Sequence, residues 1–120
     1  MTIGQLAIEY DKALGRASEL GRELARRLAE VLSGVIPDIK YSLGWYDTGP
    51  EVIYFESESH SKESMDVDRL VDELAGGRMF SLQEILEEVF RFENAYFECA
   101  IYLTPEEADE VRIAIQRATG

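Results

Sequence analysis

The stretch that decides the fold begins at Ile39 and reads IKYSLGWYDTGPEVIYFESES, ending at Ser59. Apolar and polar residues alternate on both sides of the turn signal Asp47-Thr48-Gly49-Pro50. This alternation is the pattern of two strands that each bury one face. The stretch therefore predicts a β-hairpin whose second strand covers Glu51–Ser59.

A long helix is expected before this hairpin, over roughly residues 3–33. Thr2 and Gln5 have the spacing of a capping box at its start. A straight helix of this length would measure about 45 Å at 1.5 Å per residue, whereas a compact domain of this size has a diameter near ~35 Å. We therefore expect the helix to overhang, to pack on a second chain, or to bend at Gly15 or Gly21.

Small residues form a ridge along this first helix at i, i+4 spacing, beside a ridge of leucines. Such a ridge allows the backbone of another helix to approach closely. We select three of its residues as candidate contacts between two copies of the chain: Ala17, Gly21 and Ala25. The alternative is that the ridge covers the protein's own sheet.

Two helices are expected downstream of a polar loop at residues 57–64. The first, about 67–75, has Asp66 as its cap and Gly76-Gly77 as its end. The second opens at Ser81, with Glu84 completing a capping box.

A third strand and a last helix follow. Residues 95–103 alternate between apolar and polar, and Thr104-Pro105 combines a cap residue with a proline at the first helical position. The order of elements is αββααβα. We expect a single domain over residues 1–120, of the α+β class, with a three-stranded antiparallel sheet backed by helices.

The composition indicates a soluble, cytoplasmic protein. Apolar residues make up 46% of 120 residues, which is enough for a core, and the longest apolar runs are too short to span a bilayer. The chain opens without the basic-then-apolar plan of a signal peptide. Cys99 is the only cysteine, which favours a reducing compartment. We expect the cytoplasm of a cell or of a phage-infected host.

Charge is distributed unevenly along the chain. The formal net charge is −12, from 24 acids and 12 bases. Residues 1–40 hold six of each, and residues 41–120 hold the other 18 acids with only six bases. A field of this sign repels nucleic acid and anionic lipid and attracts basic surfaces. We therefore expect neither direct nucleic-acid binding nor membrane binding, and a basic protein as partner.

Motifs for catalysis or metal binding are weak. His60 is the only histidine and follows Glu56 and Glu58 on alternate positions, but zinc normally takes three or four Cys or His ligands. We interpret His60 as a surface loop residue and Cys99 as a small core side chain. We assign no catalytic residue, no metal site and no cofactor.

Acidic pairs at helical spacing recur, among them Asp68 with Asp72 and Glu106 with Asp109. They resemble the magnesium-binding E-x-x-E and E-x-x-D pairs of all-α nucleotide pyrophosphohydrolases, which implies a carboxylate-metal nucleotide hydrolase. That family needs continuous antiparallel helices, whereas a strand and Thr104-Pro105 interrupt this chain before the last pairs. We therefore prefer to interpret the pairs as solvated helix faces.

The outward face of the predicted sheet gathers tyrosines and carboxylates. Tyrosines supply rigid contact area, and carboxylates complement arginine and lysine. The candidate partner-binding residues come from this face and from the following loop and helix: Tyr54, Glu56, Glu58, Asp66, Asp68, Asp72, Tyr96, Glu98 and Tyr102. The alternative is that the tyrosines only cover an exposed sheet.

Charge and size together favour a small acidic, non-enzymatic binding protein. It would occupy the basic surface of a nucleic-acid-binding or nuclease partner and act as an inhibitor of the anti-CRISPR, DNA-mimic or toxin-immunity type. This analogy rests on charge and size. The main alternative is a homo-oligomeric assembly or scaffold subunit, such as a homodimer, that uses the N-terminal helix. The nucleotide hydrolase is the lesser alternative.

Overall fold

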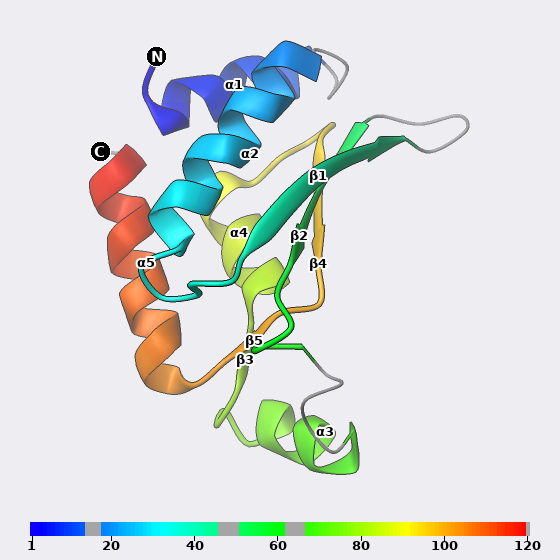
Figure 1. Cartoon of the computed structure of the whole chain (residues 1–120), viewed down its shortest axis with the longest axis vertical. Coiled ribbons are helices and arrows are strands. Elements are labelled where there is room, and N and C mark those ends of the chain that lie inside the picture. Colours follow the sequence, from blue (N-terminus) through cyan, green and yellow to red (C-terminus); the bar gives the residue numbers. More distant parts are fainter. Residues whose placement is uncertain (14–17, 46–50, 62–66, 120) are drawn as a thin grey trace.

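Two helices occupy the N-terminal region, α1 (Ile3–Lys12) and α2 (Ser18–Leu32), and they pack side by side (Figure 1). The expectation of one long helix is therefore wrong. A straight helix of about 45 Å would exceed the longest extent of the molecule, 39 Å. Gly21 lies inside α2, and Gly15 falls outside the described residues. The computed structural model describes residues 1–13, 18–45, 51–61 and 67–119.

A capping box begins the first helix, as the sequence predicts, and another begins the last helix, where the sequence predicts only a cap at Thr104. In α1 the Thr2 hydroxyl accepts from the Gln5 N–H at 3.1 Å, and the Gln5 side chain accepts from the Thr2 N–H at 2.8 Å. In α5 (Pro105–Thr119), Thr104 and Glu107 exchange the equivalent bonds at 3.2 and 2.9 Å. Both boxes satisfy backbone donors that a helix start leaves unpaired.

The predicted hairpin is confirmed: β1 (Lys40–Trp45) and β2 (Glu51–Glu56) pair antiparallel. Its expected turn lies outside the described residues. β4 (Tyr96–Cys99) then pairs parallel with β2, in the order β1-β2-β4. The sheet is therefore mixed and not purely antiparallel. Parallel strands need a long crossover connection, and the segment between β2 and β4 holds two helices, α3 (Val67–Ala75) and α4 (Leu82–Phe90).

The third predicted strand, residues 95–103, is divided in two. After β4, the segment β5 (Tyr102–Leu103) pairs with β3 (Phe80–Ser81) in a separate two-stranded sheet. Ser81 is thus held in a strand opposite Tyr102, and its side chain makes no capping hydrogen bond. The expected capping box at Ser81 is therefore wrong.

The end of α3 agrees with the sequence. Gly77 has φ of 70°, and the N–H groups of Gly77 and Arg78 donate to the carbonyls of Leu74 and Glu73 at 3.2 and 2.8 Å. This is a Schellman ending, which places glycine in the left-handed position. The expected cap at Asp66 lies outside the described residues. Figure 1 shows α3 at the foot of the molecule, apart from the three-stranded sheet.

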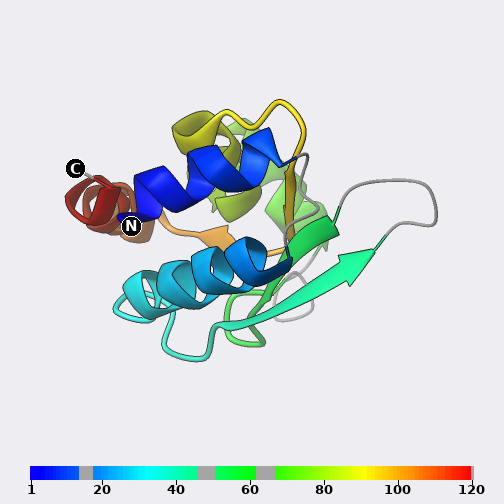
Figure 2. The ribbon, with the colours of Figure 1, turned by 90° about the horizontal axis from the view of Figure 1, so that it is seen from above.

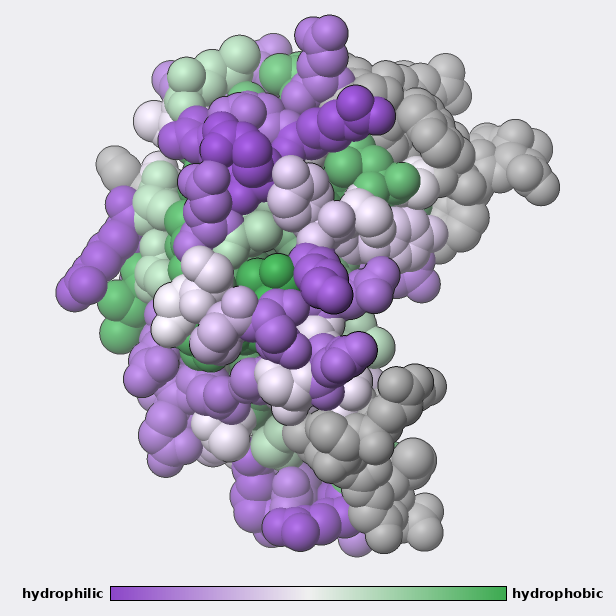
Figure 3. Space-filling model, viewed as in Figure 1, coloured by the Kyte–Doolittle hydropathy of each residue, from purple (hydrophilic) through white to green (hydrophobic). Residues whose placement is uncertain are grey.

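The hydrophobic core lies between the sheet and helices α1, α2, α4 and α5. Figure 2 shows α1, α2 and α5 on the same side of the sheet. Both sheet and helices contribute fully buried side chains, among them Leu24, Leu28, Ile53, Leu86 and Ile115. The α+β class and the expected order of helices and strands are confirmed. Figure 3 shows that the face seen in Figure 1 is mostly hydrophilic where it is coloured, with hydrophobic side chains in small separate areas. Within the described part of the chain, no helix has the length and apolar character needed to cross a membrane.

The outer edge of β4 is closed by a side chain. The Gln83 amide nitrogen donates to the Phe97 carbonyl at 2.5 Å, and its oxygen accepts from the Cys99 N–H at 2.7 Å. Gln83 therefore takes the place that a neighbouring strand would occupy.

Replacing Gln83 with leucine should lower the free energy of unfolding by about 1–3 kcal/mol, because two partly buried backbone groups lose their partner. Urea denaturation of the purified variant measures this change. Gln116, which is exposed on α5, provides the control: Gln116→Leu should cost less than about 0.5 kcal/mol. Equal effects of the two substitutions would contradict a role for Gln83 at the strand edge.

Candidate functional site

The outer face of the three-stranded sheet, the side away from the core, carries four of the predicted partner-binding residues. Tyr54 lies on β2 with its Cα opposite Glu98 of β4. Glu56 follows two residues later on β2, and Tyr96 precedes Glu98 by two on β4, so all four project from the same face. We refer to Tyr54, Glu56, Tyr96 and Glu98 as the outer-face cluster.

The tyrosines of the outer-face cluster differ in exposure. Tyr96 is 55% exposed, while Tyr54 is half-buried. A Cβ atom placed on Gly44 would come within 2.4 Å of the Tyr54 ring. The missing side chain at Gly44 therefore lets the Tyr54 ring lie across β1. The Tyr54 ring therefore lies against the sheet, whereas the Tyr96 side chain is mostly exposed to solvent. The exposed carboxylates Glu56 and Glu98 lie beside them.

The structure does not bring the other predicted residues to this face. Glu58 lies in the turn after β2, where its carbonyl accepts from the Ser61 hydroxyl at 3.0 Å. Tyr102 belongs to the two-stranded sheet, and Asp72 lies on α3 at the far end of the molecule (Figure 1). Asp66 and the side chain of Asp68 lie outside the described residues. The predicted surface is therefore smaller than the sequence suggested.

The small-residue ridge of α2 faces the chain's own core. Ala25 is 0% exposed and Gly21 is buried, while Ala17 lies outside the described residues. Helix α2 packs on α1, α5 and the hairpin. Gly21 and Ala25 are therefore not on the surface that a second copy of the chain would meet.

His60 takes part in a polar network that sequence reasoning missed. Its Nδ1 lies 2.7 Å from the Ser59 hydroxyl, and its Nε2 lies 2.6 Å from Glu107 Oε2. The Ser57 and Ser59 hydroxyls donate to Asp38 Oδ1 at 2.6 and 2.7 Å. The His60 side chain is only 15% exposed, so the interpretation as a plain surface residue is wrong. No local pattern marks this network, since Asp38 and Glu107 lie 21 and 47 residues from their partners Ser59 and His60.

Hydrogen bonds in this network favour ionised carboxylates. Desolvation raises the pKa of Glu107, but hydrogen bonds from Thr104 and His60 outweigh it, so the pKa is below its usual range. Donation from the Ser57 hydroxyl, and from the N–H and hydroxyl of Ser59, holds the pKa of Asp38 far below its usual range. The network joins the segment before β1 and the turn after β2, which lie together at the open end of the hairpin, to the start of α5.

Ser59, His60 and Glu107 have the order of a serine–histidine–carboxylate chain, but their surroundings do not favour hydrolysis. The Ser59 hydroxyl is shared with the Asp38 carboxylate. The nearby hollow holds about 110 Å³ and has three carboxylates in its lining, with Lys40 and Ser57 completing it. Such a lining opposes a developing oxyanion. We interpret this series of hydrogen bonds as a structural link between the turn after β2 and the start of α5.

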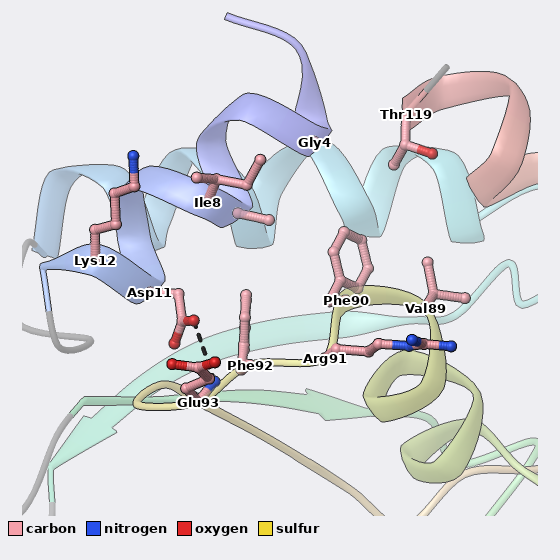
Figure 4. Close-up of a pocket in the computed structure, with 11 residues that line it drawn as sticks. Gly4, Ile8, Asp11, Lys12, Val89, Phe90, Arg91, Phe92, Glu93 and Thr119 are labelled. Atoms are coloured by element: carbon pink, nitrogen blue, oxygen red, sulfur yellow. Dashed lines mark hydrogen bonds between the residues drawn. The ribbon is translucent and has the colours of Figure 1, made fainter.

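An apolar groove of about 420 Å³ separates α1 from the segment 89–93 (Figure 4). Figure 4 shows Phe90 and Phe92 directed toward α1, with Ile8 opposite them. Beside the groove, the Asp11 carboxylate accepts from the N–H groups of residues 93, 94 and 95 at 2.8–3.1 Å. Desolvation raises the pKa of Asp11, but these hydrogen bonds lower it overall. Asp11 thus fixes the chain where it enters β4.

Reactive and metal-binding groups are few among the residues described. Burial, with the charge of Glu87, raises the pKa of the Cys99 thiol to about 12, so this thiol is not a ready nucleophile. In the described ranges, no group of three His, Cys, Asp or Glu side chains could hold a metal ion.

Comparison of the chain with models of protein families, with curated proteins and with solved structures finds no match. The outer-face cluster is the candidate functional site because it is the exposed group of aromatic and charged side chains that the sheet itself positions.

Replacing Glu107 with glutamine should lower the melting temperature near neutral pH. The further fall of the melting temperature on acidification should be smaller in this variant than in the unmodified protein. The folded-state pKa of Glu107 is depressed, so its ionisation stabilises the fold above the unfolded pKa, and this stability is lost as pH falls through the folded pKa. Thermal denaturation followed by circular dichroism between about pH 3 and pH 7 covers this window. The neighbouring variant Glu106→Gln is the control. Parallel pH curves for Glu107→Gln and the unmodified protein would contradict the assignment.

Proposed function

We propose that this protein is a small acidic binding protein that occupies a basic surface on another protein through its outer-face cluster. The observation that carries the proposal is the placement of Tyr54 and the exposed Tyr96 beside the carboxylates Glu56 and Glu98 on one sheet face. Carboxylates pair with arginine and lysine, and tyrosine rings stack on guanidinium groups and cover the alkyl stems of lysine.

The distribution of charge supports a basic partner. Residues 47–110 contain 18 acids against four lysines and arginines. The charges of α2 balance at three acids and three bases, and Arg26 contacts Glu23 at 2.6 Å and Glu30 at 2.7 Å. The negative field therefore arises mainly from the part of the chain that carries the outer-face cluster. Such a field raises the rate at which a basic partner is captured.

A sheet face suits recognition because its side chains are held by a rigid backbone. Less conformational entropy is lost on binding when the contact residues are already ordered. The register of β2 and β4 sets the spacing of Tyr54 and Glu98, and the Tyr54 ring packs closely over the backbone of Gly44. The outer-face cluster can therefore bind with little rearrangement.

The partner class that fits best is a nucleic-acid-binding or nucleic-acid-cleaving protein. Such proteins carry clustered lysine and arginine side chains that contact phosphates. A carboxylate surface that covers this cluster would exclude nucleic acid, which is inhibition of the anti-CRISPR, DNA-mimic or toxin-immunity type. The proposal includes no catalytic step, and the single cysteine suits a cytoplasmic setting. Burial of Gly21 and Ala25 gives the scaffold alternative no support.

The test compares two double charge reversals that change net charge equally. Glu56→Lys with Glu98→Lys alters the outer-face cluster, and Glu19→Lys with Glu23→Lys alters α2. A partner captured from cell extract on the immobilised protein is purified, and association rates are measured by stopped flow at low and high salt. The outer-face variant should associate about tenfold more slowly at low salt, and the difference should shrink as salt screens the charges.

The α2 variant should associate within about threefold of the unmodified protein, because its charges lie away from the contact. Equal slowing by both variants would show that only net charge matters. An association rate that does not respond to salt would contradict electrostatic recognition altogether.

A further inference from the structure

The two edge strands of the three-stranded sheet, β4 and β1, have different neighbours. At β4, the Gln83 side chain occupies the edge by bonding to Phe97 and Cys99. At the opposite edge, β1 pairs with β2 alone among the described strands. Figure 2 shows β1 along the rim of the molecule, with no other helix or strand beyond it. No second described strand pairs with β1, and Lys40, Tyr41 and Ser42 at the start of this strand are exposed. We refer to this side of β1 as the open edge.

An open strand edge has a defined chemical complement. Every second residue of an edge strand directs its N–H and C=O away from the sheet, and these groups match the backbone of another extended chain. Proteins often bind peptides in this way, with backbone hydrogen bonds supplying affinity and alternate side chains supplying specificity.

A groove of about 580 Å³ runs beside this edge, between α2 and β1. Its apolar lining comes from both elements and from the turn between them, and Tyr41 is 42% exposed there. Alternate side chains of an added strand would point to the helix side of the sheet, into this groove. The apolar lining residues are Ala29, Ile39 and Tyr41, and the polar ones include Arg26, Glu30 and Lys40.

We infer that the β1 edge receives an extended segment of a partner protein as a fourth strand, with a hydrophobic side chain of that segment in the groove. Charge does not dominate this contact, because Arg26 is already paired with Glu23 and Glu30. The inference concerns a different surface from the outer-face cluster and does not depend on the function proposed for that cluster.

A second copy of this chain fits the edge less well than a peptide does. Each copy carries a net charge of −12, and like charges of this size oppose association. Tyr41 of β1 lines the groove itself, so two copies paired through β1 would bring two hollows together. A free extended segment brings a side chain that fills the hollow.

The experiment uses a phage-displayed library of random linear peptides as the probe, selected on the immobilised full-length protein. Enriched sequences are synthesised with a fluorescent label, and their affinity is measured by fluorescence anisotropy. Tyr41→Lys, which places a charge in the groove, should weaken binding at least about tenfold. Ile113→Lys makes a similar change at a side chain that is 47% exposed on α5 and should alter affinity less than about twofold. Circular dichroism confirms that both variants fold.

A scan of backbone N-methylation along the selected peptide tests strand addition directly. Methylation should abolish binding at alternate residues and be tolerated at the residues between them, because only every second N–H donates to β1. A scan without this alternation, equal effects of Tyr41→Lys and Ile113→Lys, or no enriched sequence would each overturn the inference.

Analytical ultracentrifugation tests whether a second copy of the chain occupies the β1 edge instead of a peptide. We expect a monomer over the accessible concentration range. A dimer that Tyr41→Lys dissociates would overturn the inference, because the edge would then be filled by the chain itself.

Discussion

The packing of Phe97 is the interaction on which the rest of the structure depends. Its ring lies 4.9 Å from that of Phe92, 5.5 Å from Phe90 and 6.1 Å from Phe55, and Phe92 in turn contacts Tyr10 at 6.1 Å. These rings join β4, β2, α1 and the end of α4. Because Phe97 must face this core, its neighbours Tyr96 and Glu98 must face outward. The candidate functional face is therefore set by what the sheet buries.

Local patterns in the sequence predicted much of the fold. The hairpin, the capping box of α1, the cap at Thr104 and the glycine ending of α3 each depend on residues a few positions apart, and the structure has them. Alternation along the strands also placed Phe55 and Phe97 inside and Glu56 and Glu98 outside. These features depend on interactions between residues that are close in sequence, so they can be predicted without knowledge of the tertiary fold.

Features that depend on long-range packing could not be predicted. The direction of β4 depends on the crossover through α3 and α4, and not on the composition of the strand. Its break before Tyr102 follows from pairing with β3. The contact between His60 and Glu107 links positions 47 residues apart. Of the candidate site, the outward tyrosines and glutamates of β2 and β4 were predictable, whereas Tyr102 was misplaced because residues 95–103 read as one strand.

The acidic charge and the open β1 edge are physically linked. An exposed edge strand invites pairing with other copies, and proteins commonly prevent this with charge. On the proposals made above, a net charge of −12 would oppose association between copies and would also attract a basic partner, so that one property would serve both purposes. The outer-face cluster and the β1 edge lie on the same small sheet, and both are held in place by the core beneath it.

The most direct test of the central claim is a nuclear magnetic resonance titration of the ¹⁵N-labelled protein with a short arginine-rich peptide. Recognition through the sheet predicts that the amide shifts of Tyr54, Tyr96 and Glu98 change most, while those of α2 stay nearly constant. The changes should disappear at high salt, where exposed charges are screened. Shifts concentrated on the acids of α3 or α5, with the sheet unaffected, would contradict the account.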